Sequence, residues 1–188
     1  MRKAIAIAVW AAVAVSAGMA GSGAGADELV PTQAAIAPPP AATAAPTTGP
    51  ETGLPLPRYV SLKTTRGRAR RGPSDTHRVD WIYTLRDLPL RVTGEFEHWR
   101  RVEDSEGEGG WIHYSLLSGV RTVLVTQDMT PLRALPQPGA TELAYLEAGV
   151  VARIMECSSG WCRVSVEGSR GWLETSAVWG VDPGEELR

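Results

Sequence analysis

The side chains that could do chemistry in this sequence are few, and their spacing does not suit a reaction. The three histidines lie at His77, His98 and His113, without the His-x-x-x-His or Cys/His spacing that sets metal ligands on one face. Acidic residues crowd into one glycine-rich segment, where they repel one another in water: Glu103, Asp104, Glu106 and Glu108. No glycine-rich phosphate loop follows a predicted strand. We therefore expect no metal, no cofactor and no catalytic residue, so the chain is predicted not to be an enzyme.

Two cysteines, Cys157 and Cys162, stand with four residues between them. In a hairpin with a four-residue turn their side chains would face each other, within the Cα separation of roughly 4.4 to 6.8 Å that a disulfide requires. An exported chain matures in an oxidising compartment, which favours the bond. We predict a disulfide between them; the alternative is a pair of buried thiols.

The tryptophans are the other candidate functional residues. Six of the seven lie after residue 57. Strand alternation puts Cys162, Val164 and Val166 on one face and Trp161 on the other, and Trp111 and Trp172 alternate with Ile112 and Leu173 in the same way. Trp99, Trp111, Trp161 and Trp172 are therefore not the obvious core positions. They line a surface groove, or they pack between domains and under loops, since large aromatic side chains are mostly buried.

The elements that position these residues occur twice, at a spacing of about 62 residues. Residues 99–102 (Trp-Arg-Arg-Val) match 161–164 (Trp-Cys-Arg-Val), and Gly-Trp-Ile at 110–112 matches Gly-Trp-Leu at 171–173. Each copy consists of short alternating segments separated by turn residues, with no helical periodicity, so both are predicted to be all-β. A single small sheet exposes a face and its edges, so closure into a small barrel is expected.

Two hairpins are predicted within these copies. In the first, residues 90–96 pair with 99–102, with Leu90, Val92 and Phe96 on one face and Arg91, Thr93 and Glu95 on the other. In the second, residues 150–157 pair with 162–166. The predicted domains are 58–119 and 120–181, followed by a C-terminal tail at 182–188.

The first part of the chain has the composition of an export signal followed by a spacer. Arg2 and Lys3 precede an apolar run over residues 4–15, and Ala24-Gly25-Ala26 has the small-x-small pattern of a cleavage site. We predict a signal peptide at 1–26, rather than a retained anchor, because spanning a bilayer takes about 20 apolar residues. Residues 27–57, rich in proline, alanine and threonine, are predicted to be a disordered linker. The mature protein is expected in the periplasm or secreted, with no stable membrane span.

Charge narrows the choice of partner. Without the signal peptide the chain holds 17 basic and 21 acidic residues, a net charge of −4 that offers no general attraction to nucleic acid. The stretch 58–71 holds six basic residues and no acidic one. It forms either a solvated face or a contact with an anionic polymer or headgroup.

The residues of the first copy resemble those of bacterial SH3 domains. The resemblance rests on Arg-Arg-Gly-Pro at 70–73, the Trp-x-x-Val strand at 99–102, and Gly-Trp-Ile at 110–112 followed by Ser-Leu-Leu at 115–117. It covers about residues 58–181 and is weaker in the second copy, where Leu135 replaces the turn glycine. It implies two tandem SH3-like small β-barrels.

The resemblance also implies a function, which is the binding of a cell-wall ligand such as peptidoglycan. In the similar eukaryotic SH3 domains aromatic residues at the places of Trp99 and Trp111 line the peptide groove, and Tyr114 lies nearby. With the turn residue Arg70, the candidate ligand-binding set is Trp99, Trp111, Tyr114, Arg70, Trp161 and Trp172. The first domain keeps the turn motif and most of the positive charge, so it is expected to face the ligand. The alternative is a structural or protein-interaction module of the envelope.

Overall fold

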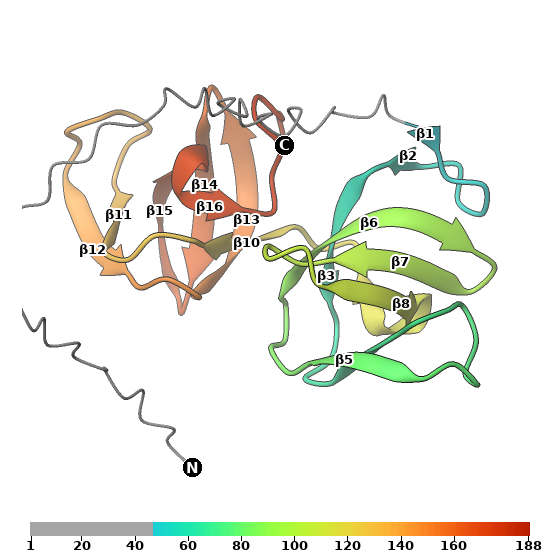
Figure 1. Cartoon of the computed structure of the whole chain (residues 1–188). Helices are drawn as coiled ribbons and strands as arrows, with labels where there is room; N and C mark the ends of the chain where they lie inside the picture. Colours follow the sequence, from blue (N-terminus) through green and yellow to red (C-terminus); the bar gives the residue numbers. More distant parts are fainter. Residues whose placement is uncertain (1–46) are drawn as a thin grey trace, which may run out of the picture. The chain divides into compact units, whose positions relative to one another are not determined.

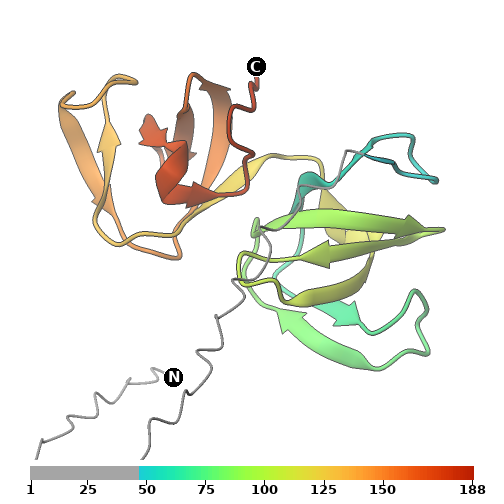
Figure 2. The same ribbon diagram turned by 45° about the horizontal axis from the view of Figure 1, so that its top comes forward.

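The computed structural model describes residues 47–188, which form β-structure with two short 3-10 helices (Figures 1 and 2). Two antiparallel sheets of seven strands are built from successive parts of the chain. The predicted signal peptide and residues 27–46 of the predicted linker lie outside the described residues. The all-β prediction with two successive small domains is confirmed.

The first sheet, which we call barrel 1, has the strand order β5-β4-β8-β7-β6-β3-β9. Its elements are β3 (Arg58–Leu62), β4 (Gly67–Arg70), β5 (Val79–Tyr83), β6 (Pro89–Phe96), β7 (Trp99–Glu103), β8 (Gly109–His113), η1 (Tyr114–Leu116) and β9 (Leu117–Ser118). Alternate side chains point into the curled sheet and form its core: Leu56, Leu62, Ala69, Tyr83, Leu90, Val92, Val102 and Ile112. Burial of each leucine, valine or isoleucine contributes about 1.5–3 kcal/mol, and this holds the sheet closed.

The second sheet, barrel 2, repeats the same order as β12-β11-β15-β14-β13-β10-β16. Its elements are β10 (Thr122–Val125), β11 (Thr130–Arg133), β12 (Glu142–Leu146), β13 (Val151–Ser158), β14 (Trp161–Val166), β15 (Ser169–Glu174), η2 (Thr175–Ala177) and β16 (Val178–Trp179). The internal repeat in the sequence is therefore a repeat of one topology, and both predicted hairpins, β6–β7 and β13–β14, are present.

The prediction of which β6 side chains face the core is wrong beyond Val92. The pairing of β6 with β7 shifts register between Val92 and Gly94, which marks a β-bulge. Because one extra residue exchanges the two faces of a strand, Glu95 points inward and is buried, whereas Phe96 is 48% exposed. The same shift between Ile154 and Glu156 in β13 turns Cys157 inward.

The prediction of a disordered linker is also wrong for its last part. Residues 47–57 form β1 (Thr47–Thr48), β2 (Pro55–Leu56) and the turn between them, and Leu56 is buried in the core of barrel 1. The buried Glu95 carboxylate accepts hydrogen bonds from the backbone N–H groups of Glu51 and Thr52, both at 3.0 Å, and from the Thr52 hydroxyl at 2.7 Å. We call residues 49–54 the strap. Its composition is typical of a spacer. It is ordered by hydrogen bonds to a carboxylate more than 40 residues later in the sequence.

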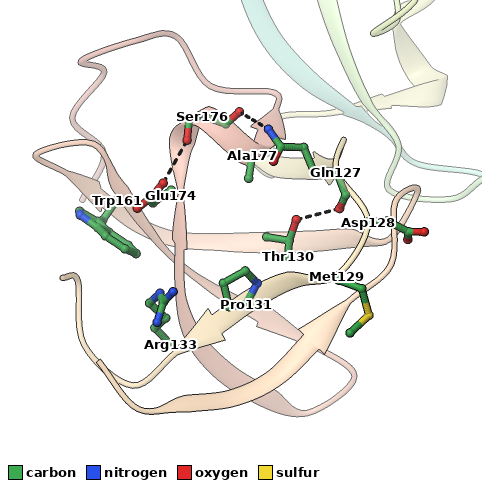
Figure 3. A pocket seen from close by; sticks show the side chains of 10 residues that line it. All are labelled: Gln127, Asp128, Met129, Thr130, Pro131, Arg133, Trp161, Glu174, Ser176 and Ala177. Carbon is green, nitrogen blue, oxygen red and sulfur yellow. Dashed lines mark hydrogen bonds between the residues drawn. The ribbon is translucent and has the colours of Figure 1, made fainter. Parts of the chain in front are cut away.

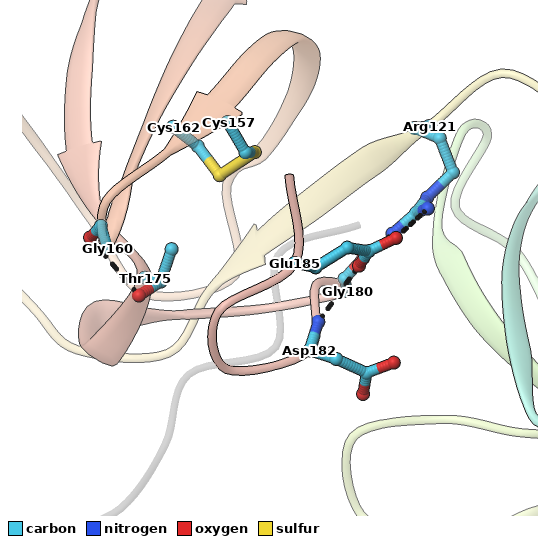
Figure 4. Close-up of a disulfide and its surroundings, with 8 residues drawn as sticks. All are labelled: Arg121, Cys157, Gly160, Cys162, Thr175, Gly180, Asp182 and Glu185. Atoms are coloured by element: carbon cyan, nitrogen blue, oxygen red, sulfur yellow. Dashed lines mark hydrogen bonds and ion pairs between the residues drawn. A yellow bond between two sulfur atoms is a disulfide. The ribbon is translucent and has the colours of Figure 1, made fainter. Parts of the chain in front are cut away.

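Barrel 2 is closed at the corresponding corner by the predicted disulfide and by the tail. Cys157 and Cys162 form a disulfide across the β13–β14 pair (Figure 4), which confirms the predicted bond. Their Cα atoms are 4.1 Å apart, slightly closer than the expected range. The tail bonds to the same strand, because the N–H and C=O groups of Leu187 pair with those of Cys157. Glu185 forms an ion pair with Arg121, at 2.6 Å between Oε1 and Nη1.

Candidate functional site

The four candidate tryptophans lie on the outer faces of the two barrels. In barrel 1, Trp99 pairs with His113 and Trp111 pairs with Arg101 across β7 and β8, whereas their neighbours Val102 and Ile112 fill the core. Barrel 2 repeats the arrangement, with Trp161 opposite Glu174 and Trp172 opposite Arg163. Directly opposite residues of an antiparallel pair project from the same face. Each barrel therefore has an outward row of two tryptophans and an arginine.

Trp99 and Trp161 are nevertheless buried, each with only 8% of its surface exposed. They belong to neither hydrophobic core cluster. Trp99 contacts His113, its partner on the neighbouring strand β8 of the same sheet. Trp111 and Trp172 are partly exposed.

Trp111 lines a cleft of about 460 Å³ on barrel 1, which we call the Trp111 cleft. Its strand neighbours are Arg70 on β4 and Arg101 on β7, so the indole stands between two arginine positions. Gly110 makes this approach possible, because a Cβ atom there would lie 2.6 Å from the Arg70 carbonyl oxygen. The Gly-Trp pair of the repeat thus brings the tryptophan strand against the arginine strand.

The charged side chains around the Trp111 cleft differ in whether other residues already bind them. Arg70 donates to the His77 carbonyl oxygen at 2.7 Å, which ties down its own hairpin loop. Arg71 binds Asp80, with Nε 2.9 Å from Oδ2, and hydrogen bonds from Arg71 and Arg78 lower the pKa of this exposed carboxylate. Arg101 forms no ion pair with another residue in the described range 47–188. It is therefore the cation best placed to receive a ligand.

Gly94 has no side chain that could form an ion pair with Arg101. It stands opposite Arg101 on β6, and a Cβ atom there would lie 4.0 Å from Cη2 of Trp111. The matching position of barrel 2 holds Glu156, which forms an ion pair of 3.3 Å with Arg163. The ladders Arg70-Trp111-Arg101 and Arg133-Trp172-Arg163 are thus alike in register. In barrel 1 Arg70 forms an ion pair of 3.5 Å with Asp75 of its own hairpin loop, and Glu103 and Glu108 also line the cleft.

The predicted aromatic set does not form one groove. Trp99 meets the edge of His113, with ring centres 5.6 Å apart, and His113 lies 5.0 Å from Tyr114. His98 approaches Tyr114 at 5.7 Å. Arg70 and Trp111 line the Trp111 cleft, whereas Tyr114, 51% exposed, lines a different depression.

Sequence reasoning missed Arg101, His98 and His113 as members of these sites. Arg101 is recognisable only from the strand register, which places it beside Trp111. The sequence spacing of the two histidines does not indicate the contact between their rings, whose centres lie 6.0 Å apart.

Barrel 2 has its own depression, the Trp161 pocket, with a volume of about 160 Å³ (Figure 3). Trp161 and Arg133 lie at one side of it, and Gln127 and Met129 lie at the other. Arg133 donates to the Ala140 carbonyl oxygen at 3.0 Å, as Arg70 does seven residues along its own hairpin. Both turn arginines therefore hold their hairpin loops together.

The described part of the chain contains neither a metal-binding cluster nor a membrane-spanning helix. Within residues 47–188, no group of three or more His, Cys, Asp or Glu side chains is arranged to hold a metal ion. Over the same range, none of the helices has the length and apolar character needed to cross a membrane.

Comparisons with known proteins place the chain in a family. No curated protein sequence matches it. Among solved structures, NlpC2 from Trichomonas vaginalis matches at 18% identity and a TM-score of 0.31, covering 68% of this chain and 51% of that one. NlpC1 from the same organism matches at 16% identity and a TM-score of 0.32, covering 70% and 48%. This chain thus spans about half the length of either protein.

The sequence model of the bacterial SH3 domain matches twice, at residues 63–119 and at 126–180. Each match falls on one of the two seven-stranded sheets. The chain therefore belongs to the bacterial SH3 domain family and carries two copies of the domain in tandem.

Proposed function

We propose that this protein is a non-catalytic binding module of the bacterial envelope and that barrel 1 holds a cell-wall ligand in the Trp111 cleft. Bacterial SH3 domains are generally binding modules for cell-wall ligands, which supports this ligand class. The disulfide and the predicted signal peptide fit a periplasmic or secreted location.

The observation that carries the proposal is that Trp111 stands between two arginine positions on the neighbouring strands. Arg70 and Arg101 flank Trp111 on the neighbouring strands, and all three line the same cleft of about 460 Å³. A partly exposed indole face suits the apolar face of a sugar ring, and a guanidinium binds a carboxylate through two parallel hydrogen bonds. A polymer of amino sugars bearing short peptides with carboxylate groups, such as peptidoglycan, presents both groups together.

The test is co-sedimentation of the purified mature protein with isolated peptidoglycan. We expect the wild type to pellet and Trp111→Ala and Arg101→Gln to remain largely in solution. Trp172→Ala is the matched control, because it removes the equivalent tryptophan from barrel 2, and it is expected to pellet like the wild type. Circular dichroism checks that each variant is folded. Equal pelleting of Trp111→Ala and wild type would overturn the assignment of the cleft.

A protein-interaction role is the second candidate, and the sheet edges favour it. β5 and β12 end their sheets and carry exposed apolar side chains, among them Ile82 (44%) and Leu143 (55%). An apolar edge strand with free backbone groups is a template for strand addition. The test is a photo-crosslinking amino acid at position 82 or 143 in intact cells. If the edges bind a protein, one recurrent envelope protein should be captured. A diffuse crosslinking pattern at both positions would count against this role.

A further inference from the structure

A second depression on barrel 1, the Tyr114 groove, is separate from the Trp111 cleft and shares none of its lining residues. Its volume is about 370 Å³. The apolar part of its lining includes Leu54 from the strap, Tyr59 from β3, and Tyr114 and Leu117 from the segment after β8. Leu54 and Tyr114 are 49% and 51% exposed, so a large apolar surface remains in contact with water there.

Two guanidinium groups, those of Arg58 and Arg100, also line the Tyr114 groove. They share one carboxylate, because Glu95 Oε1 lies 2.7 Å from Arg58 Nη2 and 3.5 Å from Arg100 Nε. Among the described residues, none of the side chains that line the groove is acidic. Two buried cations against one anion leave a net positive charge beside an apolar surface, where charge interactions are stronger than in bulk water.

Arg100 is the guanidinium with the weaker carboxylate contact. It donates to the carbonyl oxygens of Glu97 and Trp99, both at 2.8 Å, and its Cζ atom lies 5.9 Å from the centre of the Tyr114 ring. Hydrogen bonds to neutral carbonyl oxygens do not cancel its charge. The groove therefore combines an exposed phenol ring with an arginine that only a shared carboxylate balances.

Barrel 2 has an arginine at the position equivalent to Arg58, and this arginine binds an acidic segment. Arg121 occupies the place of Arg58, because its carbonyl oxygen accepts from Ile154 just as Arg58 lies opposite Val92. Its guanidinium binds Glu185 of the tail at 2.6 and 3.0 Å (Figure 4). Leu187 of the same segment packs against the core of barrel 2. A short acidic segment with an aliphatic side chain is thus the chain's own example of a peptide on this fold.

We propose that the Tyr114 groove is a second binding site, which takes an acidic protein segment with an aliphatic side chain close to its carboxylate. The aliphatic side chain packs on Leu54 and Tyr114, and the carboxylate meets the positive charge of Arg58 and Arg100. This site is independent of the Trp111 cleft, so either assignment can fail while the other holds.

The test is fluorescence polarisation of the purified mature protein with a labelled peptide that copies residues 182–188, Asp-Pro-Gly-Glu-Glu-Leu-Arg. We expect saturable binding that weakens as salt is raised, and about tenfold weaker binding by Tyr114→Ala, because truncating a central aromatic contact commonly has this effect. Tyr145→Ala is the matched control: it removes a tyrosine of nearly equal exposure, 52%, from barrel 2, and it should bind as the wild type does.

Three further arms separate the site from its neighbours. A peptide with both glutamates replaced by glutamine should bind more weakly, and Trp111→Ala should bind the acidic peptide normally. A soluble peptidoglycan fragment should not compete. The proposal is overturned if the acidic peptide shows no saturable binding, if Tyr114→Ala and Tyr145→Ala behave alike, or if the wall fragment displaces the peptide.

Discussion

The two barrels hold the same corner of one fold with different chemistry. Glu95 stands opposite Arg100 in barrel 1, and the positions 62 residues later hold Cys157 and Cys162. Both pairs follow a β-bulge that turns them inward, and both are buried. One topology therefore accepts either a buried ion pair or a disulfide at this place.

The difference determines which other segment each barrel needs. A disulfide needs no hydrogen-bond donors. Barrel 2 therefore needs only the tail, which pairs with the backbone groups of Cys157. A buried carboxylate needs several donors, because an unpaired charge in the interior is strongly unfavourable. Glu95 obtains them from Arg58, Arg100 and the strap, which makes residues before the family match part of barrel 1.

The largest expected effect is that of Glu95→Gln. It leaves two guanidinium groups without their carboxylate, and breaking a buried ion pair costs about 3–5 kcal/mol. Native-state hydrogen exchange measures the loss in barrel 1 separately from barrel 2. Glu156→Gln is the control, since its pair with Arg163 is 43% exposed on each side and is worth at most about 1 kcal/mol. Equal effects of the two substitutions would contradict the role of Glu95.

The second prediction concerns pH. Burial alone would raise the pKa of Glu95, but hydrogen bonds from Thr52, Arg58 and the strap backbone hold it at about 2, below its ordinary 4.5. A depressed pKa stabilises the folded state fully above about pH 4.5, and this contribution, about 3 kcal/mol, is lost as the pH falls toward 2.

We therefore expect the stability gap between wild type and Glu95→Gln to shrink over this acid range. The measurement is the urea unfolding midpoint of both proteins at successive pH values. A gap that stays constant through the range would show that the carboxylate does not titrate with folding. Glu185 in barrel 2, whose pKa is also lowered by Arg121 despite burial, adds a background common to both proteins.

The third prediction is that loss of the disulfide weakens barrel 2 alone. Replacing both Cys157 and Cys162 by serine opens a very short loop, for which the chain-entropy model gives about 2 kcal/mol. Hydrogen exchange of the Leu187 amide should quicken, because this amide bonds to Cys157. Reductant should reproduce the effect in the wild type and do nothing to the double variant. Matching losses in barrel 1 would refute the local role of the bond.

The smallest effect is expected at the arginines beside the partly exposed tryptophans. Arg163→Gln loses an exposed ion pair and should cost less than about 1 kcal/mol, whereas Arg101→Gln has no pair to lose and should leave stability unchanged. Thermal unfolding compares the two variants. A larger loss of stability in Arg101→Gln than in Arg163→Gln would mean that Arg101 stabilises the fold and is not available to bind a ligand.

The sequence alone determined the features that depend on local pattern. Alternation and turn residues predict strands, the 62-residue repeat predicts two copies of one topology, and the spacing of Cys157 and Cys162 predicts their bond. Alternation also places Trp111 and Trp172 outside the cores, because side chains of a regular strand point to opposite faces in turn.

Only the tertiary structure decided the features that depend on a register shift or on distant partners. The bulge after Val92 turns Glu95 inward against the alternation, and no local pattern marks where the extra residue falls. The strap is ordered by hydrogen bonds to a carboxylate 43 and 44 residues later, so its place at the end of a proline-rich stretch does not reveal it. Trp111 and Tyr114 are three residues apart in sequence, yet the end of β8 at His113 sends them to different depressions.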